Sequence, residues 1–273
     1  MSAARQVDRR RLPLPVFALA MVAIAFFALP FLGLLWRAPW GSMLDVLTQP
    51  SVRTALWLSL RTSLTATFLA VVFGVPLAWL LARVPFPGSS AVRALCLLSM
   101  VLPPVVGGVA LFFSFGRRGL FGQYLDRWFD VQLPFTTWGV VVAQTFVSMP
   151  FLVITVEAAL RQTDRRYEDA ARTLGASRWY VFRRVTIPAI QPALIAGAVL
   201  AWARALGEFG PILVFAGATR MRTEVLPTTV FLELSVGNIE AAVAVSLLMI
   251  AAAMTVLTLA RTFGLRQPLE RVL

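Results

Sequence analysis

Six long apolar stretches divide the chain, and they constrain its fold more than any other feature of the sequence. A helix needs about 20 such residues to cross the hydrocarbon core of a bilayer. The stretches cover residues 16–36, 56–81, 94–115, 138–160, 192–217 and 239–261. Because lipid cannot hydrogen-bond to unpaired backbone groups, these segments must be helical. The sequence therefore predicts an all-α integral membrane protein with six transmembrane helices, formed as one domain over residues 1–273.

The composition agrees with this interpretation and excludes several kinds of chemistry. Charged residues make up 14% of the chain, whereas an ordinary soluble domain has about 25%. The chain has no His and one Cys, Cys96, so it cannot build a His/Cys zinc site, a Ser-His-Asp triad or an internal disulfide. It also has no Lys, which excludes a Gly-rich phosphate loop ending in Lys. We therefore expect this chain to bind neither a metal nor a cofactor.

All 25 basic residues are Arg, and their distribution predicts the orientation of the spans. The net charge of +12 would suggest nucleic-acid binding in a soluble protein, but cytoplasmic loops of membrane proteins also accumulate basic residues. With the N-terminus inside, the cytoplasmic segments hold 16 Arg and the outer loops hold 7. We expect a multi-pass membrane protein, with both termini cytoplasmic and no nucleic-acid partner.

The longest predicted cytoplasmic loop, residues 161–191, has the pattern of two short helices. Asp164 can cap the first helix, and Gly175 stands where that helix should end in a left-handed residue. Ser177 can cap the second helix, which Pro188 closes. The first helix has an apolar stripe at helical spacing, formed by Tyr167, Ala170, Ala171 and Leu174. Such a surface is suited to a groove on a soluble partner.

The run from Glu168 to Pro188 resembles the signature of permease subunits of binding-protein-dependent ABC importers. That signature has Glu-Ala-Ala, then a Gly, then an apolar-Pro pair. Either Glu168 or Asp169 can take the place of the family Glu, and the spacing to the Gly favours Asp169. The resemblance implies that the loop couples the pore to a cytoplasmic ATPase through Glu168, Asp169, Ala170, Ala171, Leu174, Gly175, Ile187 and Pro188.

The fifth apolar stretch contains two opposite charges, Arg204 and Glu208, four residues apart on one helix face. Charges within a membrane are costly and usually face a bundle interior or a water-filled path. The two residues are candidates for a pore gate, and a structural ion pair is an equal alternative. Gly207 and Gly210 flank Glu208 and permit close helix contact or local unwinding.

Residues 203–210, and the segment TEVLPTTVFLEL from Thr223, resemble the importers for molybdate, tungstate and sulfate. The resemblance implies a tetrahedral oxyanion as the substrate, with molybdate the first choice, tungstate the second and sulfate the third. Side chains that could contact an oxyanion within the spans are Arg61, Ser63, Thr65, Thr67 and Ser99. Hydroxyls in membrane helices often bond only to the preceding turn, which is the plain alternative for these residues.

The same resemblance implies a location in the bacterial inner membrane, the assembly and the mechanism. Two permease copies would enclose a path that opens alternately to either side, with the first span of each copy wrapping its neighbour. Two cytoplasmic ATP-binding subunits would use ATP-Mg, so this chain is not expected to be an enzyme. An extracytoplasmic solute-binding protein would deliver the anion. A homodimer is expected, and a paired non-identical permease stays open because sulfate systems of this type resemble heterodimers.

Other classes of protein fit the sequence less well. An ion-coupled secondary transporter usually has internal repeats and paired broken helices, and no repeat is evident here. An intramembrane enzyme is disfavoured by the absence of His and of an acidic pair within a span. A transporter that works alone would also not need a patterned, partner-docking loop. A passive assembly subunit is the third alternative, and loss of transport on replacing Gly175 by Asp or Pro would distinguish the permease from it. An importer permease for another small solute remains open.

Overall fold

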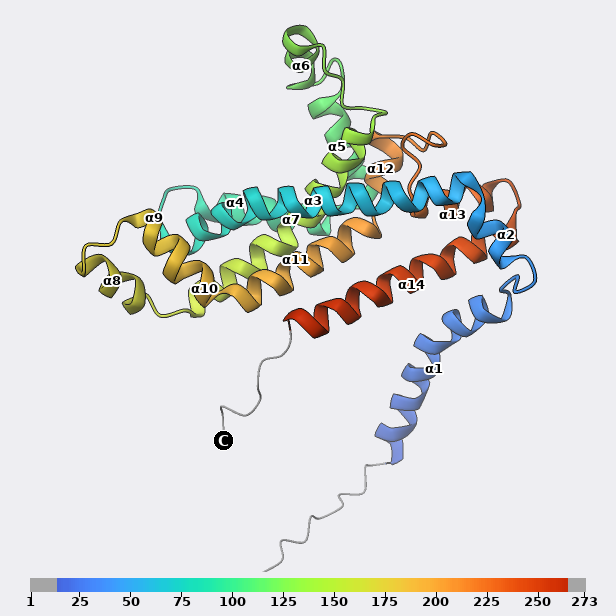
Figure 1. Ribbon diagram of the computed structural model, residues 1–273, viewed down its shortest axis with the longest axis horizontal. Coiled ribbons are helices and arrows are strands. Elements are labelled where there is room, and N and C mark those ends of the chain that lie inside the picture. Colours follow the sequence, from blue (N-terminus) through green and yellow to red (C-terminus); the bar gives the residue numbers. More distant parts are fainter. Residues whose placement is uncertain (1–13, 265–273) are drawn as a thin grey trace, which may run out of the picture.

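The computed structural model describes residues 14–264, within which every regular element is helical (Figure 1). Residues 1–13 and 265–273, and with them the predicted cytoplasmic termini, lie outside the described residues. The elements in chain order are α1 (Leu14–Trp36), α2 (Met43–Thr48), α3 (Pro50–Arg83), α4 (Ser89–Val101), α5 (Pro104–Phe115), α6 (Gly122–Phe129), α7 (Thr137–Gln162), α8 (Arg166–Thr173), α9 (Arg178–Val181), a π-helical turn (Phe182–Thr186), α10 (Ile187–Ala189), α11 (Gln191–Leu206), α12 (Gly210–Phe215), α13 (Leu226–Ser235) and α14 (Ile239–Gly264).

Four of these helices, α1, α3, α7 and α14, are long and apolar enough to cross a membrane alone. They correspond to four of the six predicted spans. Helix α3 is longer than predicted, with 34 residues, because Pro50 starts it well before the apolar stretch. The two remaining predicted spans are broken, so the six-span count depends on pairing shorter helices.

The third predicted span is two helices, and the prediction of one continuous helix over 94–115 is wrong. Helix α4 ends before Leu102 and α5 begins at Pro104. Leu102 and Pro103 have ψ angles of 135° and 132°, outside the helical region. Each of them precedes a proline, and the proline ring disfavours a helical conformation in the residue before it. The consecutive prolines therefore break the span, whereas a single proline would kink it.

The fifth predicted span, 192–217, is also broken, into α11 and α12. Residues 207–209 separate the two helices, and Pro211 stands in the first turn of α12. The local unwinding that the flanking glycines permit is therefore present, and the prediction of one helix is wrong. Helix α11 also meets the preceding helical segment, Arg178–Ala189, at an angle of 75°.

Small residues let α3, α7 and α11 pack closely at the centre of the bundle. Ala66 and Ala70 of α3 are fully buried. A Cβ added at Gly74 of α3 would lie 2.9 Å from Cδ2 of Leu152 on α7. Helix α1 diverges from this bundle and contacts α14 at one end (Figure 1). No residue in the apolar window of α1 is buried.

The two broken spans contact each other directly through α5 and α12. A Cβ added at Gly210 would lie 2.6 Å from Cβ of Pro104, and one added at Gly108 would lie 2.7 Å from Cβ of Val214. Because no real Cβ contact is this short, α5 and α12 can approach this closely only with glycine at both positions. Helix α5 from one broken span and helix α12 from the other are thereby held together as a pair.

We expect Gly210→Ala to destabilise the protein by about 1–3 kcal/mol, because overpacking forces backbone shifts. Gly207→Ala is the matched control, since its Cβ would lie no closer than 3.6 Å to a neighbouring atom, the Ala203 carbonyl oxygen. Thermal unfolding of the purified protein in detergent checks the difference. Equal melting temperatures for the two variants would contradict the close packing at Gly210.

Candidate functional site

The loop between α7 and α11 forms the candidate site, at one end of the bundle (Figure 1). Its helix-end predictions are confirmed for Ser177 and Gly175, whereas the N-cap residue of α8 is Arg165, which has no side-chain cap, and Asp164 lies one residue before it. The carboxylate of Asp164 accepts a hydrogen bond from the backbone N–H of Arg166 at 2.9 Å, at the start of α8. The hydroxyl of Ser177 accepts from the N–H of Tyr180 at 3.2 Å, at the start of α9. Gly175 has φ +86° after α8, as predicted for a helix end.

The second helix of the loop does not close at Pro188, which corrects the sequence prediction. It continues from α9 through a π-helical turn at Phe182–Thr186 into α10, and it ends at Ala189. Pro188 has no N–H to donate to the preceding turn. The widened π turn ends at Thr186, two residues before this proline, and the helix passes the proline and ends one residue later.

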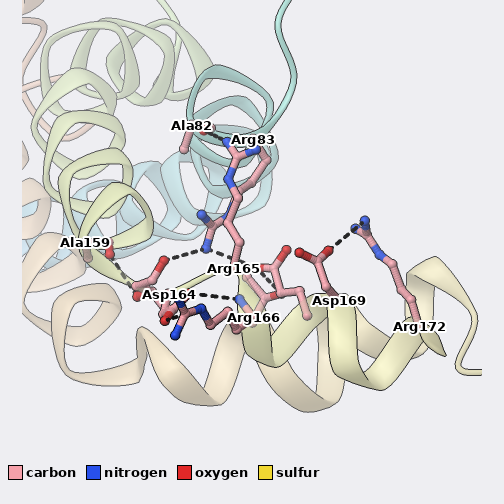
Figure 2. Close-up of polar contacts among 11 residues, drawn as sticks. Ala82, Arg83, Ala159, Asp164, Arg165, Arg166, Asp169 and Arg172 are labelled. Atoms are coloured by element: carbon pink, nitrogen blue, oxygen red, sulfur yellow. Dashed lines mark hydrogen bonds and ion pairs between the residues drawn. The ribbon is translucent and has the colours of Figure 1, made fainter. Parts of the chain in front are cut away.

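A buried ion pair clamps the loop to the end of α3. Glu168 of α8 is 5% exposed, and its Oε1 lies 3.1 Å from Nη2 of Arg83, the last residue of α3. The hydroxyl of Thr186 donates to the same oxygen at 3.1 Å. Arg165 extends from the loop and donates to the carbonyl of Ala82 at 3.0 Å (Figure 2). The loop is therefore attached to α3 both by a side chain of α3, Arg83, and by side chains of the loop, Glu168 and Arg165.

Glu168 and Asp169, the two candidates for the family Glu, have different environments. The side chain of Asp169 is exposed, and its nearest charge is Arg172 at 3.8 Å on the same helix (Figure 2). Exposed pairs of this kind contribute little to stability. Glu168 is thus the acidic residue that holds the loop in place, whichever of the two aligns with the family Glu.

A second carboxylate, Glu157 of α7, joins three helices close to the loop, and sequence reasoning missed it. Its Oε1 lies 2.7 Å from Nε of Arg93 on α4 and 2.9 Å from Nη2 of Arg161 on α7. Arg93 also donates to the carbonyl of Leu81 on α3 at 2.7 Å. The signal in the sequence was an acidic residue within an apolar stretch, four residues before an arginine. Helices α3, α4 and α7 are therefore connected where the loop is attached.

The loop exposes a group of apolar side chains among charged ones such as Arg166 and Asp169. Leu174 is 88% exposed, and Tyr167, Trp179 and Tyr180 are also exposed. A hollow of about 470 Å³ lies between α8 and α9 and is lined by Leu174, Gly175 and Tyr180, among others. The predicted stripe therefore faces away from the protein, which is typical of a protein-binding surface.

Arg204 and Glu208 form the ion pair that their spacing predicts, with Nη1 and Oε2 2.7 Å apart. The Glu208 side chain is 1% exposed and that of Arg204 is 34% exposed. Glu208 lies in the break between α11 and α12, next to the contact with α5. The pair thus joins the last turn of α11, which carries Arg204, to the unwound part of the fifth span, which carries Glu208.

The other candidate pore residues differ in their exposure and in their hydrogen bonds. Arg61 is exposed and lines a cavity. Ser63 is fully buried and accepts a hydrogen bond from Nε1 of Trp202 at 3.0 Å. The hydroxyls of Thr65, Thr67 and Ser99 donate to backbone carbonyls of the preceding turn. In the described residues, no group of three His, Cys, Asp or Glu side chains is placed to hold a metal.

We expect Glu168→Ala to lower the free energy of unfolding by about 3–5 kcal/mol, because it leaves Arg83 as a buried unpaired charge. Asp169→Ala, at the exposed neighbour, should change it by less than about 0.5 kcal/mol. Thermal unfolding of both purified variants checks the contrast. Similar losses in both variants would contradict the anchoring role of Glu168.

We expect Arg204→Gln to lower the melting temperature more than Glu208→Gln, because it leaves the buried carboxylate without its partner. The double variant should recover part of this loss, since the uncompensated charge is gone. Melting temperatures of the three variants form the cycle that measures this coupling. Unchanged melting temperatures in both single variants would exclude a structural ion pair and leave the gate interpretation.

The sequence of this chain is similar to a family of membrane transport proteins and to individual permeases. Residues 70–266 match the family described as the binding-protein-dependent transport system inner membrane component. The molybdenum transport system permease protein ModB of Mycobacterium tuberculosis is 45% identical over 242 residues, which cover 89% of this chain and 91% of that protein. The sulfate transport system permease protein CysT of Salmonella typhimurium is 38% identical over 272 residues, covering 95% and 98%.

Solved structures show the same fold. A chain of the bacterial alginate ABC transporter, in complex with an alginate pentasaccharide-bound periplasmic protein, superposes with a TM-score of 0.70. The alignment covers 91% of this chain and 93% of that chain, at 19% identity. A chain of the MetNI methionine ABC transporter superposes with a TM-score of 0.59 over 76% of this chain, at 20% identity.

Proposed function

Because the chain belongs to the family of binding-protein-dependent transport system inner membrane components, we propose that it is the permease of an ATP-driven importer for a tetrahedral oxyanion. The observation that carries this proposal is the loop of α8 and α9, which exposes apolar side chains such as Leu174 and Trp179 while Glu168 attaches it to the bundle. The named relatives support molybdate as the first substrate, with sulfate also represented. Tungstate has the same shape and charge as molybdate and stands second.

The partners follow from the two ends of the bundle. Two cytoplasmic ATP-binding subunits bind the loops, residues 161–191, and hydrolyse ATP-Mg, so this chain contributes no catalytic residue and no cofactor site. A solute-binding protein delivers the anion at the opposite end. Both termini are then cytoplasmic, and the single domain of residues 1–273 crosses the inner membrane six times. The α4–α5 and α11–α12 pairs each count as one broken crossing.

The contacts of the loop suggest how a movement reaches the pore. A displacement of α8 acts on α3 through the Arg83–Glu168 pair. A displacement of α9 acts on α11, because only Ile190 separates α10 from α11. Helix α11 leads to the break at residues 207–209, where α12 is held against α5. Alternating access then consists of moving the paired α5 and α12, with Arg204, Glu208, Gly207 and Gly210 at the gate.

A second copy of the chain is the proposed partner for α1. This helix has 23 residues, its apolar window has no buried residue, and it diverges from the bundle (Figure 1). An arm of this kind can reach across to a neighbouring permease and cover its surface. A homodimer is the simplest assembly, and a paired non-identical permease satisfies the same geometry.

We expect Leu174→Asp to weaken binding of the ATPase subunit by about 30-fold or more, the loss typical of a central interface residue. Its melting temperature should not change, since Leu174 is almost fully exposed. Gly175→Pro should also abolish ATP-driven uptake, whereas Gly175→Asn should retain uptake because Asn tolerates the left-handed conformation. Co-purification of the ATPase and molybdate uptake into vesicles are the measurements.

The same vesicles distinguish the rival class of transporter. Uptake by Leu174→Asp at the wild-type rate in vesicles without ATP would show an ion-coupled secondary transporter. It would also remove the coupling role from residues 161–191. Loss of ATPase binding together with loss of uptake is the result that the proposal requires.

A further inference from the structure

A cavity of about 370 Å³ lies where α3, the start of α7 and the loop before α13 meet. Arg61 of α3 and Arg222 of the loop both line it. Arg61 is 22 residues from Arg83, so along α3 it lies roughly 33 Å from the loop of α8 and α9. The cavity is therefore at the end of the bundle away from the proposed ATPase surface.

The charge of this cavity is uncompensated. Its lining includes two guanidinium groups and no carboxylate. Within residues 14–264, neither Arg61 nor Arg222 makes an ion pair or a side-chain hydrogen bond. Arg220, two residues before Arg222, does pair with a carboxylate, that of Glu233 at 3.0 Å. The lack of a partner thus distinguishes the cavity arginines from a neighbour on the same loop.

Two threonines of the cavity donate their hydroxyl protons to backbone carbonyls of the two cavity arginines. The hydroxyl of Thr65 donates to the carbonyl of Arg61 at 2.8 Å. The hydroxyl of Thr137, at the start of α7, donates to the carbonyl of Arg222 at 3.1 Å. Both hydroxyl protons are therefore already donated. The Thr65 bond lies within α3 at Arg61, and the Thr137 bond ties the backbone of Arg222 to the start of α7. The guanidinium groups remain as the strong free donors.

The location of Arg61 within an apolar stretch limits the surroundings that its charged side chain can have. A charged side chain that faced lipid at this depth would be costly, so it must face water or a charged partner. Arginine also presents a planar set of donors that matches the oxygens of a tetrahedral oxyanion. A water molecule takes about 30 Å³ of liquid volume, so the cavity has room for such an anion with part of its hydration shell.

We propose that this cavity is a transit site for a dianionic tetrahedral oxyanion, held between the guanidinium groups of Arg61 and Arg222. The inference rests on the proposed function and adds to it a binding site within the permease itself. Two guanidinium groups without a carboxylate favour a doubly charged anion over a neutral solute. Their partial exposure keeps binding weak enough for the anion to move on, as transport requires.

Transport by the complete complex gives the first test. The complex with its ATPase and solute-binding subunits is placed in phosphatidylcholine vesicles, and uptake of molybdate, tungstate and sulfate is measured. Arg61→Gln and Arg222→Gln should each reduce uptake about tenfold or more at equal protein levels. Arg53→Gln is the matched control: it removes an exposed arginine from the same helix, outside the cavity. An equal loss in the control, or none in the cavity variants, would overturn the proposal.

A second measurement does not depend on transport. In a Cys96→Ala background, the purified Thr65→Cys variant is modified by a sulfonate-bearing thiol reagent. Tungstate should slow the modification severalfold relative to chloride at equal ionic strength, and adding Arg222→Gln should remove this protection. Protection that persists in Arg222→Gln, or that phosphatidylglycerol gives and tungstate does not, would overturn the site in favour of a nonspecific effect or a lipid phosphate.

The two tests separate the site from the proposed function. If the wild-type complex transports none of the three anions, the oxyanion function fails. If it transports them while Arg61→Gln and Arg222→Gln behave like Arg53→Gln, only the transit site fails.

Discussion

The organisation of this protein depends on one buried contact, the pair of Glu168 and Arg83 with Thr186. The helices of a membrane bundle gain little from apolar burial against each other, because lipid is equally apolar. A loop outside the bilayer has even less apolar surface to bury against the bundle. A hydrogen-bonded ion pair in a low-dielectric pocket supplies the missing attachment, and its loss leaves an uncompensated charge. The loop can therefore expose its apolar side chains and still keep a fixed position.

The sequence predicted the local features of the loop well because they depend on neighbouring residues. The cap at Ser177 and the left-handed Gly175 need only their own turns of helix, and both are present. Asp164 lies one residue before the N-cap position of α8 and bonds to the N–H of Arg166. The distinction between Glu168 and Asp169 could not be predicted in this way. It depends on Arg83, which is 85 residues earlier in the chain and comes close only in the folded bundle.

The apolar stretches predicted where the helices lie but not where they break. Hydropathy does not distinguish one long helix from two short ones, since both are equally apolar. The breaks near Pro103 and at residues 207–209 are set by backbone chemistry, and they are stable because α5 and α12 pack against each other there. The cavity arginines show the same limit: Arg61 was a candidate from its position in a span, whereas Arg222 could be recognised only once the fold had placed it nearby.

The π-helical turn at Phe182–Thr186 sets the rotational phase between the loop and α11. A π turn takes up about one residue more than an α turn, and one residue corresponds to about 100° of rotation around a helix axis. This turn therefore decides which side of the bundle the apolar face of the loop points to, independently of the side of α11 that carries Arg204. A single inserted residue in this turn would consequently rotate the exposed side chains of the loop and leave the position of Arg204 on α11 unchanged.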